Sequence, residues 1–151
     1  MSSLHLRVTA NPKQAGLVRD RLLQYCRANM VPPADSEDFV TAISEAFANA
    51  VEHAHTLDPI VVDLRIDDDD KLIAIISDDG RGFDMKKAES MLPPAGAERG
   101  RGIPLMRRYS DLFALRSHPG EGTVVTLIRY IHSPRGLTGR SLARGRGTPL
   151  A

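Results

Sequence analysis

One segment of the chain, residues 44–54, carries polar side chains at a spacing that suits a helix. Glu45, Asn49 and His53 are four residues apart, so on a helix they lie along one face. Asparagine is a modest helix former, and its amide oxygen is a ligand that a hard cation accepts. Taken alone, the pattern favours a solvated helix face, and a cation ligand beside a carboxylate is the alternative.

A second group of candidate residues follows an apolar segment typical of a strand. Asp78 and Asp79 stand at its end, and Gly80 and Gly82 come next. A carboxylate at a strand end can accept a hydrogen bond from an exocyclic amine such as N6 of adenine. Glycines at alternate positions let the backbone approach a planar ligand closely. An ordinary Asp-Gly turn explains the same residues equally well, so both interpretations stay open.

A third group combines glycines and arginines before a predicted helix. Arg99, Gly100, Arg101 and Gly102 form a Gly-x-Gly-x-x-Leu pattern with the residues that follow. Flexible glycines leading into a helix N-terminus suit a phosphate, and the two arginines could reach a terminal phosphate. The pattern follows a loop, which argues against a dinucleotide-binding fingerprint, and the chain has no P-loop motif. Solvated loop arginines are the alternative.

The fourth group opens the last predicted strand. Gly120, Glu121 and Gly122 precede Thr123, whose hydroxyl could bond the same base edge as Asp78. Taken alone, this segment is an ordinary hairpin turn followed by a β-branched residue.

The elements that must position these residues follow from hydrophobic periodicity and from the turn residues. The predicted order is a strand (4–8), two helices (12–29 and 35–54), two strands (60–66 and 72–77), a loop (78–101), a helix (102–110) and two strands (113–117 and 123–131). Asp35 or Ser36 is the expected N-cap of the second helix. Strands that arrive in hairpins exclude a fully parallel sheet. We therefore predict an α/β sandwich, with a mixed, mostly antiparallel sheet and helices packed on one face.

Length and charge suggest one domain followed by a tail. The 151 residues suit one domain, which we place at residues 1–131, and residues 132–151 are expected to form a disordered tail rich in Arg and Gly. The tail holds four arginines and no acid, which leaves 16 basic against 19 acidic residues in the body. A weakly acidic body argues against direct nucleic-acid binding. No apolar run suggests a signal peptide or a membrane span, and the single Cys26 requires no oxidising compartment, so we expect a cytoplasmic protein.

The four groups together resemble the N, G1, G2 and glycine-threonine boxes of GHKL ATPases, the gyrase, heat-shock-chaperone, histidine-kinase and MutL superfamily with the Bergerat fold. The resemblance covers about residues 4–131 and keeps the family's order. It implies that ATP and Mg²⁺ are the cofactors. It also implies that Asn49 binds Mg²⁺ and that Glu45 is the general base. Asp78 would bind adenine with support from Thr123, and Gly80 and Gly82 would shape the base pocket. Gly100 and Gly102 would belong to a lid over the phosphates.

Within that superfamily, the single short domain with Ser-Glu-Ala-x-x-Asn-Ala-x-x-His-Ala looks like the bacterial anti-sigma factor serine/threonine kinases. The resemblance implies a kinase that binds a sigma factor and phosphorylates a STAS-domain antagonist, with a possible homodimer. One departure is that Glu98 stands where the best-known members have an arginine, which is shifted here to Arg99. Two alternatives stay open: an ATP-binding regulatory module without kinase activity, and the detached catalytic domain of a sensor histidine kinase.

Overall fold

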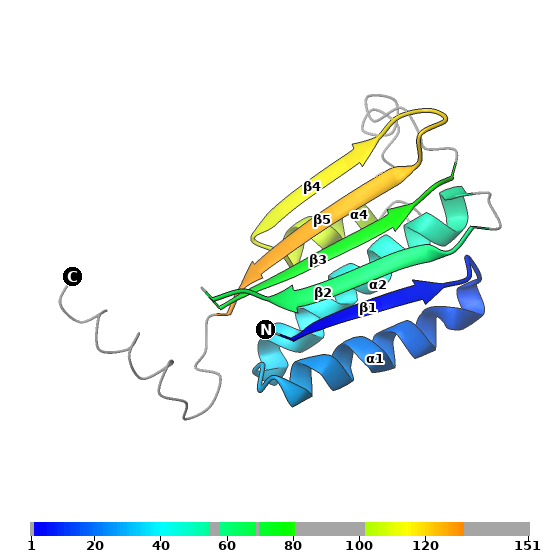
Figure 1. Cartoon of the computed structure of the whole chain (residues 1–151). Coiled ribbons are helices and arrows are strands. Elements are labelled where there is room, and N and C mark those ends of the chain that lie inside the picture. The colour runs from blue at the N-terminus through cyan, green and yellow to red at the C-terminus, as the bar shows by residue number, and fades with distance from the viewer. Residues whose placement is uncertain (1, 55–57, 69, 81–101, 132–151) are drawn as a thin grey trace.

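A computed structural model describes residues 2–54, 58–68, 70–80 and 102–131. Within them one antiparallel sheet is covered on one face by helices, which confirms the predicted two-layer sandwich (Figure 1). The strands lie in the order β1-β2-β3-β5-β4. Their bounds are β1 Ser3–Val8, β2 Ile60–Ile66, β3 Lys71–Asp78, β4 Leu112–Ser117 and β5 Thr123–Tyr130. The helices are the 3-10 helix η1 (Pro12–Gln14), α1 (Ala15–Ala28), α2 (Pro33–Ala54) and α4 (Gly102–Arg108).

The first predicted helix divides into two pieces at its start. The Asn11 side chain accepts a hydrogen bond from the Lys13 N–H at 2.9 Å and caps η1, and α1 begins only at Ala15. Of the predicted apolar stripe, Ala15 is exposed, whereas Val18, Leu22 and Tyr25 are buried together with Cys26. Ala15 follows the 3-10 turn directly and is the first residue of α1.

The longest helix, α2, begins earlier than its predicted N-cap. It starts at Pro33, where the fixed φ of proline suits the first helical position and no N–H is needed. Asp35 is therefore inside the first turn, and the expectation that Asp35 or Ser36 caps the helix is wrong. The Asp35 carboxylate instead accepts a hydrogen bond from Arg129 Nε on β5 at 3.1 Å.

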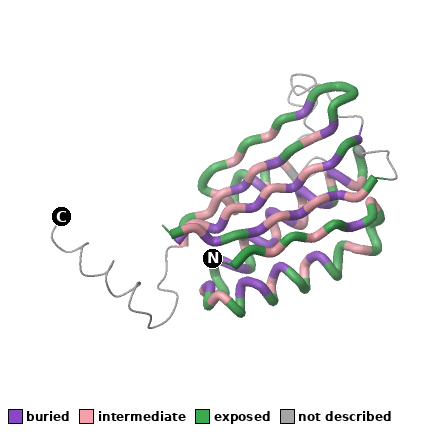
Figure 2. The backbone as a smooth tube through the Cα atoms, viewed as in Figure 1, coloured by how far each residue is buried: buried purple, intermediate pink, exposed green. Residues whose placement is uncertain are grey.

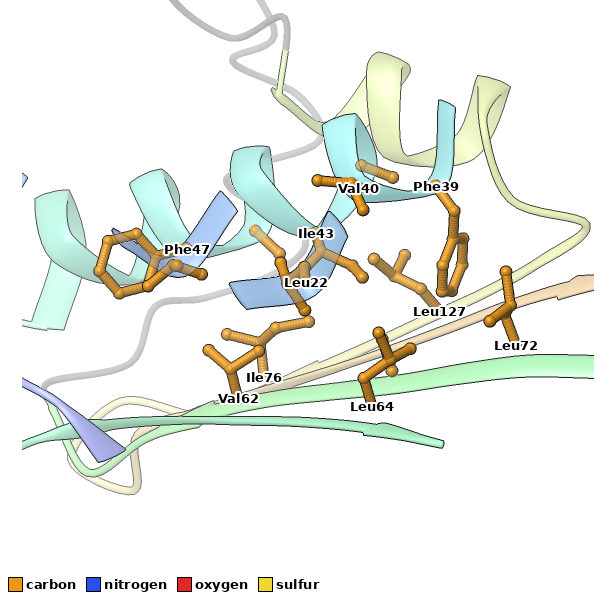
Figure 3. Packing of buried hydrophobic residues seen from close by; sticks show 14 of the residues in the cluster. Leu22, Phe39, Val40, Ile43, Phe47, Val62, Leu64, Leu72, Ile76 and Leu127 are labelled. Carbon is orange, nitrogen blue, oxygen red and sulfur yellow. The ribbon is translucent and has the colours of Figure 1, made fainter. Parts of the chain in front are cut away.

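The core lies between the sheet and the helices. Figure 3 shows that side chains of α1 and α2 point at side chains from the strands. The large buried residues there are Leu22, Phe39, Ile43, Phe47, Val62, Leu64, Leu72, Ile76 and Leu127. On β3 the buried residues alternate with half-buried ones, as expected for a strand with one covered face.

Two predicted hairpins are confirmed, and they meet at the centre of the sheet. β2 pairs with β3 across a turn in which Asp67 Oδ1 accepts the Lys71 N–H at 3.0 Å. β4 pairs with β5, and β5 also pairs with β3, so Asp78 lies directly opposite Thr123. β1 is an edge strand, as predicted. Among the described residues, no helix is both long and apolar enough to cross a bilayer.

Candidate functional site

Three polar side chains form a row across one end of the sheet. Asp78 ends β3 and faces Thr123, the first residue of β5, which in turn faces Ser117, the last residue of β4. Opposite residues of antiparallel strands point to the same side, and the burial pattern places this row on the face that the helices cover. In Figure 1 the end of β3, the β4–β5 turn and the C-terminal end of α2 lie at the same end of the molecule.

Asp78 is a buried carboxylate at the end of this row. It is 7% exposed, and one of its oxygens accepts the Gly80 N–H at 2.9 Å. Burial raises the pKa of Asp78, the Gly80 hydrogen bond lowers it, the Asp79 charge raises it and His53 lowers it, with a net increase. A buried acceptor of this kind suits a ligand that brings its own N–H groups.

The β4–β5 turn lies against the backbone of Asp78. Gly122 has a φ of +79°, and a Cβ built there would be 2.2 Å from the Asp78 carbonyl oxygen and 3.1 Å from the Asp79 Cα. Gly120 has a similar φ of +83°, yet a Cβ there would meet no atom within 4 Å. Gly122 is therefore required for a close approach between the turn and β3, and the sequence reasoning did not assign it to the site.

Ser117 is the second residue that the sequence reasoning missed. It is 3% exposed, its Oγ donates to the Gly122 carbonyl at 3.2 Å, and it lies 2.7 Å from Thr123 Oγ1. None of the sequence motifs includes it. The usable signal is its place in the alternation of β4, which puts a serine on the buried face at the level of Thr123.

The polar face of α2 approaches this row at the C-terminal end of the helix. Glu45 and Asn49 are half-buried and His53 is exposed, and α2 packs against β3 and β5. His53 is near enough to lower the pKa of Asp78 by its charge. In the described part of the chain, no hydrogen bond or ion pair engages Glu45 or Asn49. Their oxygen atoms therefore remain available to a bound group.

The remaining predicted site residues divide into two sets. Gly80 is buried and follows Asp78 closely, and Gly102 begins α4, with Pro104 in its first turn as the sequence predicts. Gly82, Arg99, Gly100 and Arg101 lie outside the described residues. Their roles at the base and the phosphates stay predictions.

Comparison with known proteins identifies the family. Residues 8–129 match the model of the histidine kinase-like ATPase domain. The chain belongs to this family. The match runs from the end of β1 almost to the end of β5, and it confirms the resemblance that the four motifs carry.

Relatives and solved structures agree with this assignment. An anti-sigma F factor of Pasteuria penetrans is 33% identical over 105 residues, which are 65% of this chain and 70% of the relative. The serine-protein kinase RsbW of Bacillus subtilis is 28% identical over 142 residues, which are 87% of this chain and 88% of the relative. The structure of the RsbU and RsbW domains of Rv1364c from Mycobacterium tuberculosis matches with a TM-score of 0.68 and 25% identity. That match covers 87% of this chain and 33% of the other.

Two further solved structures share the fold. The SiaB-SiaC complex from Pseudomonas aeruginosa matches with a TM-score of 0.60 and 12% identity, covering 83% of this chain and 88% of the other. A histidine kinase domain from Erythrobacter litoralis matches with a TM-score of 0.51 and 18% identity, covering 67% and 46%. The histidine kinase-like ATPase fold therefore extends beyond the relatives that are similar in sequence.

The chemistry of the site fits a nucleotide. A purine with an exocyclic amine brings N–H donors, and Asp78 presents a buried acceptor for them. A Mg²⁺ ion takes oxygen ligands, and the Asn49 amide oxygen on α2 has no hydrogen-bond partner among the described residues. Acceptors for the base and an oxygen for the metal thus come from different layers of the sandwich.

Proposed function

We propose that this chain is an ATP-dependent serine/threonine protein kinase that binds a sigma factor and phosphorylates a STAS-domain antagonist of the anti-sigma factor. The observation that carries the proposal is that the row of Asp78, Thr123 and Ser117, in which Asp78 and Ser117 are buried, occurs together with the Glu45–Asn49 face of α2. Relatives named serine-protein kinase and anti-sigma F factor support the choice of reaction and of partners. We propose that the chain acts in the cytoplasm, where it would meet these partners.

Each residue then has a role that its chemistry allows. Bound Mg²⁺–ATP supplies the phosphoryl group and the charge that neutralises the phosphates. Asp78 accepts from the adenine amine beside Thr123, and Asn49 offers its amide oxygen to the metal ion. Glu45 accepts the proton of the acceptor serine or threonine hydroxyl at its carboxylate. For the other site residues we keep the roles that the family resemblance implies.

Replacing Glu45 by alanine tests the kinase role. The protein would be incubated with labelled ATP and a STAS-domain partner, and phosphate on the partner would be measured as acid-stable phosphoserine or phosphothreonine. We expect Glu45→Ala to reduce transfer at least a hundredfold, because general-base catalysis contributes that much, and to leave ATP binding intact. Glu52→Ala is the matched control, because Glu52 is an exposed glutamate on the same helix.

The outcomes separate the three functions. Tight ATP binding without phosphate transfer to any STAS partner contradicts the kinase function. If the release of the partner is then also unaffected by Glu45→Ala, the chain is a regulatory ATP-binding module. Acid-labile phosphate on a histidine identifies the catalytic domain of a sensor kinase. Transfer by the Glu52→Ala variant and loss of transfer in the Glu45→Ala variant support our proposal.

We also propose that the chain forms a homodimer through the sheet face that carries no helices. Figure 2 shows that buried positions alternate with half-buried or exposed ones along the strands. On the face without helices, Ile73 of β3 lies opposite Ile128 of β5, Ile75 lies between Asp63 and Thr126, and Leu112 and Val124 are large and exposed. The charged residues around these side chains include Arg7, Arg65, Lys71 and Arg116, together with the ion pair of His5 and Asp63. An apolar centre with a polar rim is the usual anatomy of a protein interface.

The dimer is tested by the mass of the protein in solution. Leu112→Asp places a charge at the proposed interface, and Leu17→Asp is a matched control, because the two leucines are 51% and 52% exposed and Leu17 lies on α1. Light scattering should give a dimer for the parent protein and for Leu17→Asp, and a monomer for Leu112→Asp. A monomeric parent, or a dimer that persists in Leu112→Asp, contradicts this interface.

A further inference from the structure

Arg129, near the end of β5, has contacts that none of the proposed roles uses. Its Nε donates to Asp35 Oδ1 and its Nη1 donates to the Tyr109 carbonyl oxygen, each at 3.1 Å. Its Nη2 is 3.6 Å from Asp38 Oδ2, and the side chain is 15% exposed. A guanidinium carries five N–H donors in a fixed plane, so one side chain can hold several groups in a set geometry. Here it joins β5 to the start of α2 and to the end of α4.

The chain directly after α4 is fixed to β5 by further contacts. Tyr109 follows the last helical residue, and its N–H still donates to the Leu105 carbonyl at 3.1 Å. Carbonyls at a helix C-terminus have no partner within the helix, and a cation beside them also complements the helix dipole. The Asp111 N–H donates to the Ile128 carbonyl at 2.8 Å, and Asp111 Oδ2 accepts the Tyr130 N–H at 2.7 Å. Three consecutive residues of β5 therefore hold this end of α4.

α4 depends on such outside contacts for its position. It has seven residues, is about 10 Å long and is too short to be a stable helix alone. Among its described side chains Met106 is buried at 1% exposure, Ile103 is partly buried against the core, and Arg107 and Arg108 are exposed. A short helix moves as a unit, so releasing its end also shifts its first residue, Gly102.

We propose that Arg129 is a positioning residue that holds α4 against α2, and thereby keeps Gly102 at the place beside the phosphates that the family resemblance implies. This inference rests on the proposed ATP binding. α4 packs against α2, the helix that carries Asn49, so both elements on the phosphate side would share this anchor. Arg129 acts on the phosphates only through α4, because Thr123 and Arg129 stand at opposite ends of β5, roughly 20 Å apart along the strand.

Arg129→Lys is the informative variant. Lysine keeps a positive charge beside Asp35, but a single ammonium lacks the planar fork that also reaches the Tyr109 carbonyl. Amide hydrogen exchange would compare α4 with β3, and calorimetry would give the Kd of Mg²⁺–ATP. We expect the amides of α4 to exchange about tenfold faster relative to those of β3, and ATP to bind about five- to tenfold more weakly, the effect of one charged hydrogen bond.

Val18→Ala is the control for a loss of stability alone. Val18 is 1% exposed on α1, which packs against α2 and β1. Its truncation should lower the urea midpoint, yet the Kd of Mg²⁺–ATP and the exchange of α4 relative to β3 should stay at the parent's values while the protein is folded. A residue that only stabilises the fold would behave in the same way.

Asp111→Ala tests the same anchor if Arg129→Lys folds poorly. Asp111 is exposed, and its removal releases the contact with Tyr130 at the same end of α4. It should speed the exchange of α4 and weaken ATP binding in the same sense. If the variants leave the exchange of α4 in step with β3, or leave the ATP affinity unchanged, the inference fails. A parent protein that binds no ATP contradicts the proposed function first, and the exchange of α4 then still shows whether Arg129 holds the helix.

Discussion

Replacing Gly122 by alanine adds one methyl group at the point where the β4–β5 turn touches β3. The new Cβ would lie 2.2 Å from the Asp78 carbonyl oxygen. Restoring an ordinary contact, which begins near 3.4 Å, requires the two backbones to separate by about 1 Å. Because Asp78 is attached to that carbonyl, the change displaces the carboxylate that we assign to the base.

Gly120→Ala separates this effect from the strain of the turn itself. Both glycines have a left-handed φ, +79° at Gly122 and +83° at Gly120. Alanine at either position should therefore reduce the free energy of unfolding by roughly 1–2 kcal/mol. Only Gly122→Ala adds a steric overlap, which in a packed site destabilises by about 1–3 kcal/mol more. Gly122→Ala should also weaken ATP binding roughly ten- to a hundredfold, because the displaced Asp78 carboxylate would lose its hydrogen bond to the base.

Urea denaturation and calorimetry with Mg²⁺–ATP measure the two effects separately. Gly120→Ala should bind ATP like the parent protein and should lose only the stability that the strained φ of alanine costs. Gly122→Ala should lose more stability and most of its ATP affinity. Equal stability losses and equal affinities in the two variants would refute the close approach on which the site depends.

Further predictions concern the charged and buried groups. Asp78→Asn should stabilise the unliganded protein at neutral pH, since burial raises the pKa of this carboxyl, and should weaken ATP binding roughly ten- to a hundredfold in calorimetry. Arg129→Met should reduce the free energy of unfolding by about 3–5 kcal/mol, because Asp35 is 4% exposed and Arg129 Nε is 3.1 Å from it. Asp38→Ala, which removes a carboxylate that is 47% exposed and 3.6 Å from Arg129, should lose less than about 1 kcal/mol in the same urea titration. Burial raises the pKa of Cys26 to about 12, so a thiol reagent should label it at neutral pH only after unfolding, and rapid labelling of the native protein would contradict its burial.

Local patterns predicted most of the fold, because each of them is decided by neighbours in the chain. The apolar spacing of α2 and the alternation in β2 and β3 depend on residues a few positions apart. The predicted N-cap of α2 was wrong, because Pro33 begins the helix earlier and because the Asp35 carboxylate has a distant partner. Asp35 has the chemistry of an N-cap, but its carboxylate is engaged by Arg129, which is 94 residues further along the chain.

The site was only partly predictable for the same physical reason. Asp78 and Thr123 are recognisable as motif residues, but their placement opposite each other follows from the pairing of β3 with β5, which no local pattern specifies. Ser117 and the contact of Gly122 with Asp78 exist only once that pairing is made. Sequence spacing therefore revealed which groups could bind a nucleotide, and strand register decided which of them touch.

The raised pKa of Asp78 connects the stability of the fold with its binding function. Because the pKa in the folded protein lies above its ordinary value of 3.8, the folded state holds more protons than the unfolded state in the interval between the two values. The stability of the unliganded protein should therefore fall as the pH rises through that interval. Once the folded carboxyl has lost its proton, its charge is buried, whereas the charge of the unfolded counterpart is exposed and better solvated. A ligand that donates hydrogen bonds to this carboxylate would relieve that penalty, so under the proposed function the group that destabilises the empty site is also one that adenine binding would stabilise.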